Sequence, residues 1–396
     1  MNAETLPGSV YPRQIGDDDA FSLPAWIYHD PAFFELEKQH IFRTSWQLVC
    51  HQNDIPATGD YHTFEILGES VMSVRGDDGQ IRSFHNVCRH RASRLLDGAK
   101  GQCGRRITCP YHAWTYSLDG RLVGVPFKST FRGLDMEKHG LVALDQELFM
   151  GFVFVRFAPG LPSVREMAAP YLHELEVYRM EQLVPQGRVT LRPRNVNWKN
   201  VADNYSDGLH ITVAHPGLTR LFGTGYGIEA QPWIDKMWGA LREVESSNWS
   251  ERLYQKLLPP VDSLPPERQR LWTYFKLWPN VAFDIYPDQI DFMQFVPVSP
   301  TQTMIREIAY VHPDSRREMR AARYLNWRIN RKVNVEDKTL IERVQAGMGS
   351  SSYTVGPLSE NEVCLRSFSR RMRSLIPESR LPRNPAAGGS ASVPPR

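Results

Sequence analysis

The spacing of hydrophobic and polar positions changes along the chain and predicts a helix followed by a long block of strands. After Asp30-Pro31, a suitable N-cap and first helical residue, apolar side chains recur at roughly helical spacing. This spacing predicts a helix from Pro31 to Phe42. From Ser45 to Ala158, short alternating apolar runs are separated by Gly, Pro and Asp residues, a pattern typical of antiparallel strands. We therefore expect a domain made almost entirely of strands.

Several segments of this block have the alternation of strands, and one longer segment has the pattern of a hairpin. The expected strands are Trp46–Cys50, Ser70–Val74, Arg82–Asn86, Arg106–Cys109 and Gly151–Arg156. The hairpin spans Ala113–Val125, with Asp119-Gly120 at its tip. Beyond the block, apolar residues on one face predict a helix at Val164–Arg179, and a strand is expected at Gly187–Val196.

The chain is long enough for two domains and a sizeable core. It has 396 residues, of which 41% are hydrophobic. A proline- and glycine-rich boundary at 159–162 separates an expected strand-rich domain, 45–160, from a larger domain, 161–383. Residues 1–44 are expected to form an arm and a helix that pack on the larger domain. Residues 384–396, rich in Ala, Gly, Ser and Pro, are expected to be a disordered tail.

Charge and cysteine content exclude several classes of protein. The 47 Lys and Arg nearly balance the 44 Asp and Glu, so neither a nucleic acid nor a membrane surface is an expected partner. The 5 cysteines are too few, and odd in number, for a disulfide framework. The first ten residues lack the basic start and apolar run of a signal peptide, and no apolar stretch has membrane-spanning length. We therefore expect a cytoplasmic protein.

Two short pairs of metal-ligating side chains lie at the ends of expected strands. Cys88 and His90 form a C-x-H pair, and after the 18 residues 91–108, Cys109 and His112 form a C-x2-H pair. Two thiolates and two imidazoles bind either a zinc ion or a two-iron, two-sulfur cluster of the Rieske type. A zinc finger usually places its Cys together and its His together. Here each loop offers one Cys and one His, one ligand for each iron, which favours the cluster over zinc.

A second group of candidate metal ligands lies in the larger domain. Asp207, His210 and His215 form the pattern D-x2-H-x4-H, a weak signal by itself. Residues 197–209 have a helix-compatible pattern, so Asp207 and His210 are expected to share a helix face. On a continuous helix His215 would point elsewhere, but Pro216 disfavours helical geometry at His215. We therefore expect the helix to loosen there, so that both imidazoles reach one metal ion.

Together, the two motifs resemble those of the Rieske non-haem iron oxygenases. The similar stretches are NVCRHRAS, RITCPYHAW, NWKNVADNYSDGLHI, HPGL and YLNWRIN, and the resemblance extends from about Leu23 to Pro377. It implies an α+β fold, in which an all-β Rieske domain precedes a larger catalytic domain with a twisted antiparallel sheet flanked by helices, of the helix-grip type. It also implies two cofactors, a Rieske-type 2Fe–2S cluster and a mononuclear Fe²⁺ ion.

The resemblance implies that a carboxylate from a late helix completes the mononuclear iron site. The segment Asn334–Met348 matches this helix, and Asp337 lies in register with its apolar residues, which are Leu340, Ile341, Val344 and Met348. A carboxylate on a buried face is costly unless it is paired or coordinated, which favours Asp337. Glu336 lies off this face and is expected to be solvated or salt-bridged. The rival candidates lie in an expected strand region and are Asp291, ranked second, Asp284 and Asp288.

The resemblance also implies a route for electrons. Family members assemble as homotrimers in which the cluster of one subunit lies next to the mononuclear iron of its neighbour. Asp207 would bridge the two centres through hydrogen bonds to His112 of one subunit and His210 of the other, and Asn204 would lie near the iron. Since the chain has no G-x-G-x-x-G after a strand, electrons from NAD(P)H are expected to arrive through a separate reductase with flavin and iron–sulfur groups.

The substrate is predicted from an aromatic region and from the resemblance. Half of the 10 tryptophans lie between Trp233 and Trp278. Five other aromatic residues lie in or near the same window: Tyr226, Tyr274, Phe275, Phe283 and Tyr286. Most of these aromatic side chains are expected in the core, but a few would suit a cage for a quaternary ammonium group or a planar ring. The chain resembles the subgroup that acts on methylated ammonium compounds, which includes stachydrine (proline betaine) demethylases. This implies O2-dependent hydroxylation of an N-methyl group and release of formaldehyde. The alternatives are an aromatic ring-hydroxylating alpha subunit, often with a second subunit type, and a Rieske electron carrier, which would leave the second motif without a purpose.

Overall fold

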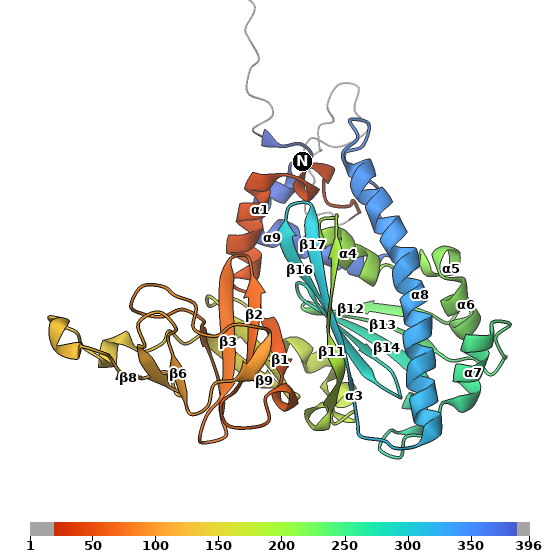
Figure 1. The fold of residues 1–396 in the computed structure, drawn as a ribbon. Coiled ribbons are helices and arrows are strands. Elements are labelled where there is room, and N and C mark those ends of the chain that lie inside the picture. Colours follow the sequence, from red (N-terminus) through yellow and green to blue (C-terminus); the bar gives the residue numbers. More distant parts are fainter. Residues whose placement is uncertain (1–19, 386–396) are drawn as a thin grey trace, which may run out of the picture. The chain divides into compact units, whose positions relative to one another are not determined.

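The computed structural model describes residues 20–385, which divide into two compact units (Figure 1). One unit contains residues 42–188 and 310–313, and the other contains the described residues 20–41, 189–309 and 314–385. Most of the predicted arm and most of the predicted tail, residues 1–19 and 386–396, lie outside the described residues. None of the described helices combines the length and the apolar composition that crossing a bilayer requires.

The unit containing residues 42–188 is built from antiparallel sheets with the strand orders β1-β10-β9, β4-β3-β2-β5 and β6-β7-β8. The strands are β1 (Gln47–His51), β2 (Asp60–Ile66), β3 (Glu69–Arg75), β4 (Ile81–His85), β5 (Lys100–Gln102), β6 (Arg106–Thr108), β7 (Thr115–Ser117), β8 (Leu122–Gly124), β9 (Asp145–Phe149) and β10 (Phe152–Arg156). Short 3₁₀ segments lie at Gln52–Asp54, Lys128–Thr130 and Glu137–His139. The predicted strands are therefore confirmed, with small shifts of their ends.

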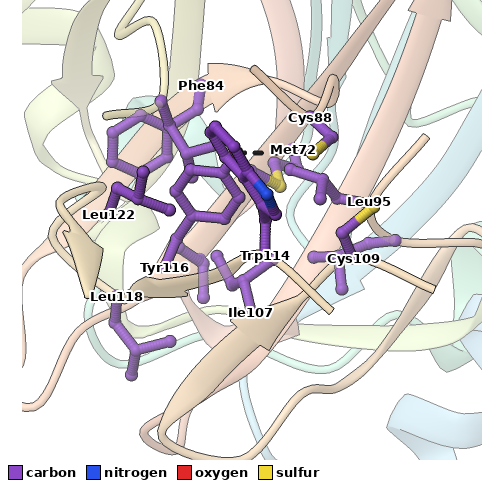
Figure 2. Close-up of a cluster of buried hydrophobic side chains, with 13 residues drawn as sticks. Met72, Phe84, Cys88, Leu95, Ile107, Cys109, Trp114, Tyr116, Leu118 and Leu122 are labelled. Atoms are coloured by element: carbon purple, nitrogen blue, oxygen red, sulfur yellow. Dashed lines mark hydrogen bonds between the residues drawn. The ribbon is translucent and has the colours of Figure 1, made fainter. Parts of the chain in front are cut away.

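The predicted hairpin forms between β7 and β8, and its turn is constrained by close packing. Gly120 has φ +91°, and a Cβ atom there would lie 2.6 Å from the ring of Phe84, so a larger residue would displace that ring. The hairpin and β6 contribute to one hydrophobic core, which Figure 2 shows in close-up. This core includes Met72, Phe84, Leu95, Ile107, Trp114, Tyr116 and Leu122.

The prediction of one continuous helix over Val164–Arg179 is wrong. The chain forms two short helices, α2 (Val164–Ala168) and α3 (Leu172–Glu176), separated by a 3₁₀ turn at Ala169–Tyr171. Pro170 lies in this turn. Proline has no N–H to donate, and its ring clashes with the carbonyl one turn earlier, so the α-helix breaks there although the apolar spacing continues.

The other unit is organised around one sheet with the strand order β11-β17-β16-β15-β14-β13-β12. Its strands are β11 (Val184–Arg194), β12 (Gly227–Ala230), β13 (Ile234–Ala240), β14 (Leu271–Leu277), β15 (Val281–Ile285), β16 (Ile290–Ser299) and β17 (Gln302–Val311). Pairing from β12 through β16 is antiparallel. The predicted strand at Gly187–Val196 corresponds to β11, and the expected strand region around Asp284 to Asp291 forms β15 and β16.

Helices accompany this sheet, and the first of them confirms a predicted cap. The helices are α1 (Pro31–Glu37), α4 (Trp198–Ser206), α5 (Ile211–Ala214), α6 (Pro216–Phe222), α7 (Trp249–Leu257), α8 (Arg317–Met348) and α9 (Val363–Leu375). The Asp30 carboxylate accepts a hydrogen bond from Phe33 N at 2.7 Å, as an N-cap residue does. A π-helical turn, Lys38–Phe42, continues α1, so the predicted helix is present over its full length.

The long helix α8 supplies one side of the core of this unit and runs alongside the sheet (Figure 1). Its residues Ala322, Leu325 and Ile329 pack in one cluster with side chains of α6 and with Trp272 of β14. The face is less continuous towards the C-terminus than predicted. Ile341 is buried, but Val344 is 48% exposed, so the predicted apolar face is not buried along its whole length.

Candidate metal centres

The two Cys–His loops repeat the same backbone hydrogen bonds. Cys88 N donates to Ser93 O, and Cys109 N donates to Trp114 O, each five residues further on. In return, Ala92 N donates to Cys88 O and Ala113 N donates to Cys109 O. Both alanines have left-handed φ values, 56° and 54°. Two loops of the same shape therefore present one Cys and one His each.

The side chains of these loops fit a cluster with two sulfur and two nitrogen ligands. Cys88 and Cys109 are 2% and 3% exposed and lie in one core. The rings of His90 and His112 are 4.6 Å apart between centroids. The Nδ1 atoms of both rings are buried and have no hydrogen-bond partner among the described residues. A buried nitrogen without a partner is costly, and a bond to iron would satisfy it.

The surroundings of the sulfurs combine apolar walls with specific contacts. Figure 2 shows Trp114 and Tyr116 beside the two cysteines. The ring of Trp114 stacks on His90 at 4.9 Å, and the Tyr116 hydroxyl lies 3.4 Å from Cys88 Sγ. Burial raises the pKa of Cys88. Burial would also raise the pKa of Cys109. Backbone hydrogen bonds from His112 and Tyr111 outweigh this effect, so the pKa of the Cys109 thiol is lowered. The loop that carries Cys109 is therefore suited to hold a thiolate.

The second motif lies at a break between helices. Helix α4 ends at Ser206, and Asp207 is extended (φ −82°, ψ 126°), so the prediction that Asp207 and His210 share a helix face is wrong. The two side chains still meet, because the turn after α4 brings Asp207 Oδ2 to 3.0 Å from His210 Nδ1. His215 has φ −117° and ψ 75°, and Pro216 begins α6. The predicted effect of Pro216 on His215 is therefore confirmed.

Three ligand atoms converge at this break. His215 Nε2 lies 3.1 Å from His210 Nε2 and 3.0 Å from Asp337 Oδ1, and His210 Nε2 lies 3.5 Å from the same oxygen. Neighbouring donors around a metal with bonds of about 2.1 Å are separated by similar distances. His210, His215 and Asp337 are the residues whose ligand atoms meet in this way among those described.

The electrostatics of the three groups also favour a cation. Burial alone would lower the pKa of His210, but hydrogen bonds to Asp207 and Asp337 outweigh it and raise the pKa to about 9. Burial would raise the pKa of Asp337, yet the two imidazoles lower it to about 2. The site therefore stabilises positive charge between the rings and the carboxylate, as a ferrous ion requires.

Each of the two imidazoles has a carboxylate on its far nitrogen. Asp207 accepts from His210 Nδ1, and Glu336 Oε2 accepts from His215 Nδ1 at 2.8 Å. These contacts fix the tautomer that leaves Nε2 free for a metal. The expectation that Glu336 is solvated or salt-bridged is confirmed by an ion pair with Lys332 at 3.8 Å. The contact of Glu336 with His215 gives it an orienting position that the helix pattern alone did not reveal.

Two further predicted residues lie in different environments. Asn204 Nδ2 donates to Asp337 Oδ1 at 3.1 Å and lies 3.5 Å from His210 Nε2, so it adjoins the ligand atoms as expected. Asp291, the second-ranked carboxylate, lies on β16 and accepts from Gln289 Nε2 at 2.8 Å. It does not belong to the converging set of described residues, and the geometry favours Asp337.

A pocket opens beside the converging ligand atoms. Its lining includes three tyrosines, a buried carboxylate and several amides. The lining residues other than the three candidate ligands are Asn204, Tyr205, Ile211, Leu218, Tyr226, Tyr274, Asp284, Met293, Asn330, Val333 and Asn334. The aromatic residues that line it are tyrosines, and no tryptophan is among the described lining residues. Trp272 and Trp278 are buried in the core, and Tyr226 and Tyr274 are the lining residues from the predicted aromatic region.

Family models match both parts of the chain. Residues 45–140 match the Rieske 2Fe–2S domain, and residues 168–378 match the ring hydroxylating alpha subunit catalytic domain. The carnitine monooxygenase oxygenase subunit of Escherichia coli is 31% identical over 364 residues, 88% of this chain and 90% of the relative. The glycine betaine monooxygenase oxygenase subunit of Pseudomonas aeruginosa is 38% identical over 205 residues, 51% of this chain and 47% of the relative.

A solved structure agrees with the fold. A quaternary ammonium Rieske monooxygenase in complex with an inhibitor has a TM-score of 0.76 and 25% identity, covering 91% of this chain and 96% of the other. The chain belongs to the Rieske non-haem iron oxygenase alpha subunits. The predicted α+β fold is confirmed, as are the two cofactors, a Rieske 2Fe–2S cluster and a mononuclear iron. Members of this family take electrons from a reductase and act on small substrates.

The assignment of the carboxylate ligand predicts different iron contents for two variants. Asp337→Ala removes an oxygen that meets both imidazoles, so mononuclear iron should be lost while the cluster absorbance stays. Asp291→Ala should keep both. Metal analysis with the visible spectrum of each purified variant checks this. Iron loss in Asp291→Ala with retention in Asp337→Ala would reverse the assignment.

The contact between Tyr116 and Cys88 predicts a change in cluster potential. A hydroxyl that donates to a ligating sulfur stabilises the more negative, reduced cluster. Tyr116→Phe should therefore lower the reduction potential, on the order of tens of millivolts, with the cluster still bound. Spectroelectrochemical titration measures it. Tyr111→Phe is the control, because its exposed hydroxyl contacts Arg91 instead of a sulfur. An unchanged potential in Tyr116→Phe would contradict the role.

Proposed function

We propose that this chain is the oxygenase component of a monooxygenase that removes an N-methyl group from a quaternary ammonium compound as formaldehyde. The observation that carries the proposal is the lining of the pocket beside the three candidate ligands. Tyrosine rings and a carboxylate face this space, and its described lining contains no Lys or Arg. Aromatic faces attract a permanent cation, whereas an aromatic acid would meet no opposite charge there. The named activities of the relatives, on carnitine and glycine betaine, agree with this lining.

The proposed reaction is an oxidative N-demethylation. One O2, two electrons and two protons convert the N-methyl group into an N-hydroxymethyl group and water. The hydroxymethyl ammonium then breaks its carbon–nitrogen bond and releases formaldehyde, a proton and the tertiary amine. The mononuclear iron supplies the redox chemistry when it is bound. His210, His215 and Asp337 would hold the ion, and the pocket that they line would admit the substrate and O2.

The residues around the ligands orient and support them in this proposal. Asp207 and Glu336 hold the rings of His210 and His215 through their Nδ1 atoms, so that both Nε2 atoms point to one position. Asn204 donates to the remaining ligand and limits the directions that the Asp337 carboxylate can take. These contacts place the chain's own groups before a substrate enters, which lowers the cost of assembling the site.

We propose that electrons arrive across a subunit boundary, from the cluster of a neighbouring copy in a homotrimer, which an NAD(P)H-dependent reductase reduces. Asp207, which contacts His210, is partly exposed, with 19% of its side chain accessible. Next to it, Leu209 is 46% exposed and Val213 is 84% exposed. An apolar rim around a partly exposed carboxylate suits a surface that another subunit covers. Asp207 would then contact His112 of the neighbouring copy.

The proposal predicts formaldehyde from a quaternary ammonium substrate. The holoenzyme with a surrogate reductase, NADH and O2 should release formaldehyde with at least one of carnitine, glycine betaine, stachydrine or choline, in proportion to oxygen uptake. Formaldehyde and the demethylated amine are measured together. Oxygen uptake and hydroxylated product with an aromatic acid alone, without formaldehyde, would instead support ring hydroxylation and contradict the proposal.

The bridging position of Asp207 predicts that its loss slows electron transfer, whereas a change at Glu336, the carboxylate behind the other imidazole, does not. Asp207→Ala should slow substrate-dependent reoxidation of the cluster roughly 100-fold per bound iron, since the path between the centres is interrupted. Glu336→Gln is the matched control, because it changes the carboxylate behind the other imidazole. It should weaken iron binding but keep the rate per bound iron. Stopped-flow absorbance measures the rate, and a wild-type rate in Asp207→Ala would refute the bridge.

A further inference from the structure

We propose that Asp284 is the specificity-determining residue of the pocket and provides the counter-charge for a quaternary ammonium group. This inference rests on the proposed function and deepens it, because it names the group that distinguishes a cation from a neutral molecule of the same shape. Asp284 is not one of the converging metal-ligand candidates. It has no role in holding the metal in the account above.

The sheet places Asp284 in the pocket from a fixed position. On neighbouring strands, Tyr274, Asp284 and Asp291 are paired across β14, β15 and β16, so their side chains emerge on the same face of the sheet. Tyr274 and Asp284 line the pocket, and Asp291 does not. Asp284 is 9% exposed. A carboxylate in the middle of a sheet has little freedom, so its position is set before a ligand arrives.

The hydrogen bonds of Asp284 suit a cation that cannot donate hydrogen bonds. Its Oδ1 accepts from the Tyr205 hydroxyl, and its Oδ2 lies 3.4 Å from the Tyr286 hydroxyl. The two oxygens therefore already have donors. A primary ammonium or a guanidinium would have to share the remaining lone pairs of these oxygens with the two tyrosines to satisfy its own N–H groups. A quaternary ammonium has no N–H group, so it needs only the negative charge of Asp284 and the faces of the tyrosine rings that line the pocket.

The charge balance around Asp284 leaves room for an added cation. Burial raises the pKa of Asp284 to about 6, against the effect of its hydrogen bonds to tyrosines and of Arg192. Arg192 is itself paired with Glu307. Burial and the neighbouring carboxylates Asp284 and Asp288 raise the pKa of Asp291 well above its usual value. Asp284, whose pKa is about 6, is largely ionised near neutral pH, and it is the carboxylate of this row that lines the pocket.

A pair of probes with the same shape and different charge tests the inference. Choline and its neutral analogue, in which a carbon atom replaces the nitrogen, are titrated into the holoenzyme by calorimetry. Asp284→Asn should weaken choline binding by roughly 10- to 100-fold, the scale of a partly screened ion pair, and leave binding of the analogue within about twofold. Asp291→Asn is the matched control and should change neither. A variant that binds both probes like the wild type, or loses both equally, overturns the inference.

A pH profile of the wild type tests the same inference without a substitution. The carboxylate form of Asp284 is present above its pKa, so choline affinity should fall as pH drops through about 6. Binding of the neutral analogue should not follow that profile. The titratable and charged groups facing Asp284 are Tyr205 of α4, Tyr274 of β14, Tyr286 after β15, Tyr226, Asp291 of β16 and Arg192 of β11. Burial raises the pKa of each of these tyrosines, so the tyrosines stay neutral over this range. If the affinities of choline and of its neutral analogue depend on pH in the same way, Asp284 does not act as the counter-charge.

The outcomes separate this inference from the proposed function. If no quaternary ammonium compound yields formaldehyde, but the wild type prefers choline to its analogue and Asp284→Asn loses that preference, the counter-charge stands and demethylation fails. If formaldehyde forms and Asp284→Asn keeps the preference, demethylation stands and the counter-charge is wrong. Iron content and cluster absorbance are measured on each variant to establish that both centres are intact.

Discussion

The site depends on two imidazole nitrogens and a carboxylate oxygen that the fold holds close together. His210 Nε2 and His215 Nε2 are 3.1 Å apart, and both are near Asp337 Oδ1. Lone pairs at such distances repel each other unless a proton or a metal cation lies between them. The carboxylates Asp207 and Glu336 hold the rings from behind, so the nitrogens cannot turn away. Positive charge at this point is thus a requirement of the fold.

The two imidazoles converge because the helices of this region are interrupted. The end of α4 at Ser206 and the short helix α5 let His210 and His215 approach the same point from either side of a turn. The third ligand candidate comes from α8, whose buried residues hold it against the sheet. A continuous helix through this region would have separated the two imidazoles. The same sheet presents Tyr274 and Asp284 to the pocket that the three candidate ligands also line.

The sequence predicted what depends on local chemistry. The order of Cys and His in the two loops indicated the cluster, and Pro216 indicated the conformation of His215. The family resemblance indicated the late helix, and the apolar register within it indicated Asp337. The predictions that failed concern positions where two local sequence features favour different structures, or where tertiary contacts decide the structure. Pro170 broke a helix that apolar spacing favoured, and the extended conformation of Asp207 ended another. Two features could not be predicted: the orienting contact of Glu336 and the position of Asp284 among tyrosines. Both depend on contacts between elements that are distant in sequence, and residue spacing carries no information about such contacts.

The most direct test of the central claim is a single turnover without any reductase. The claim is that electrons held by the cluster are used at the mononuclear iron to oxidise a methyl group on a quaternary nitrogen. The reduced holoenzyme is mixed with O2 and a methyl-labelled quaternary ammonium compound, and cluster absorbance and labelled formaldehyde are followed together. The account predicts that the compound accelerates cluster oxidation and that labelled formaldehyde appears at the same rate. Cluster oxidation that is indifferent to every such compound, with no labelled formaldehyde, would contradict it.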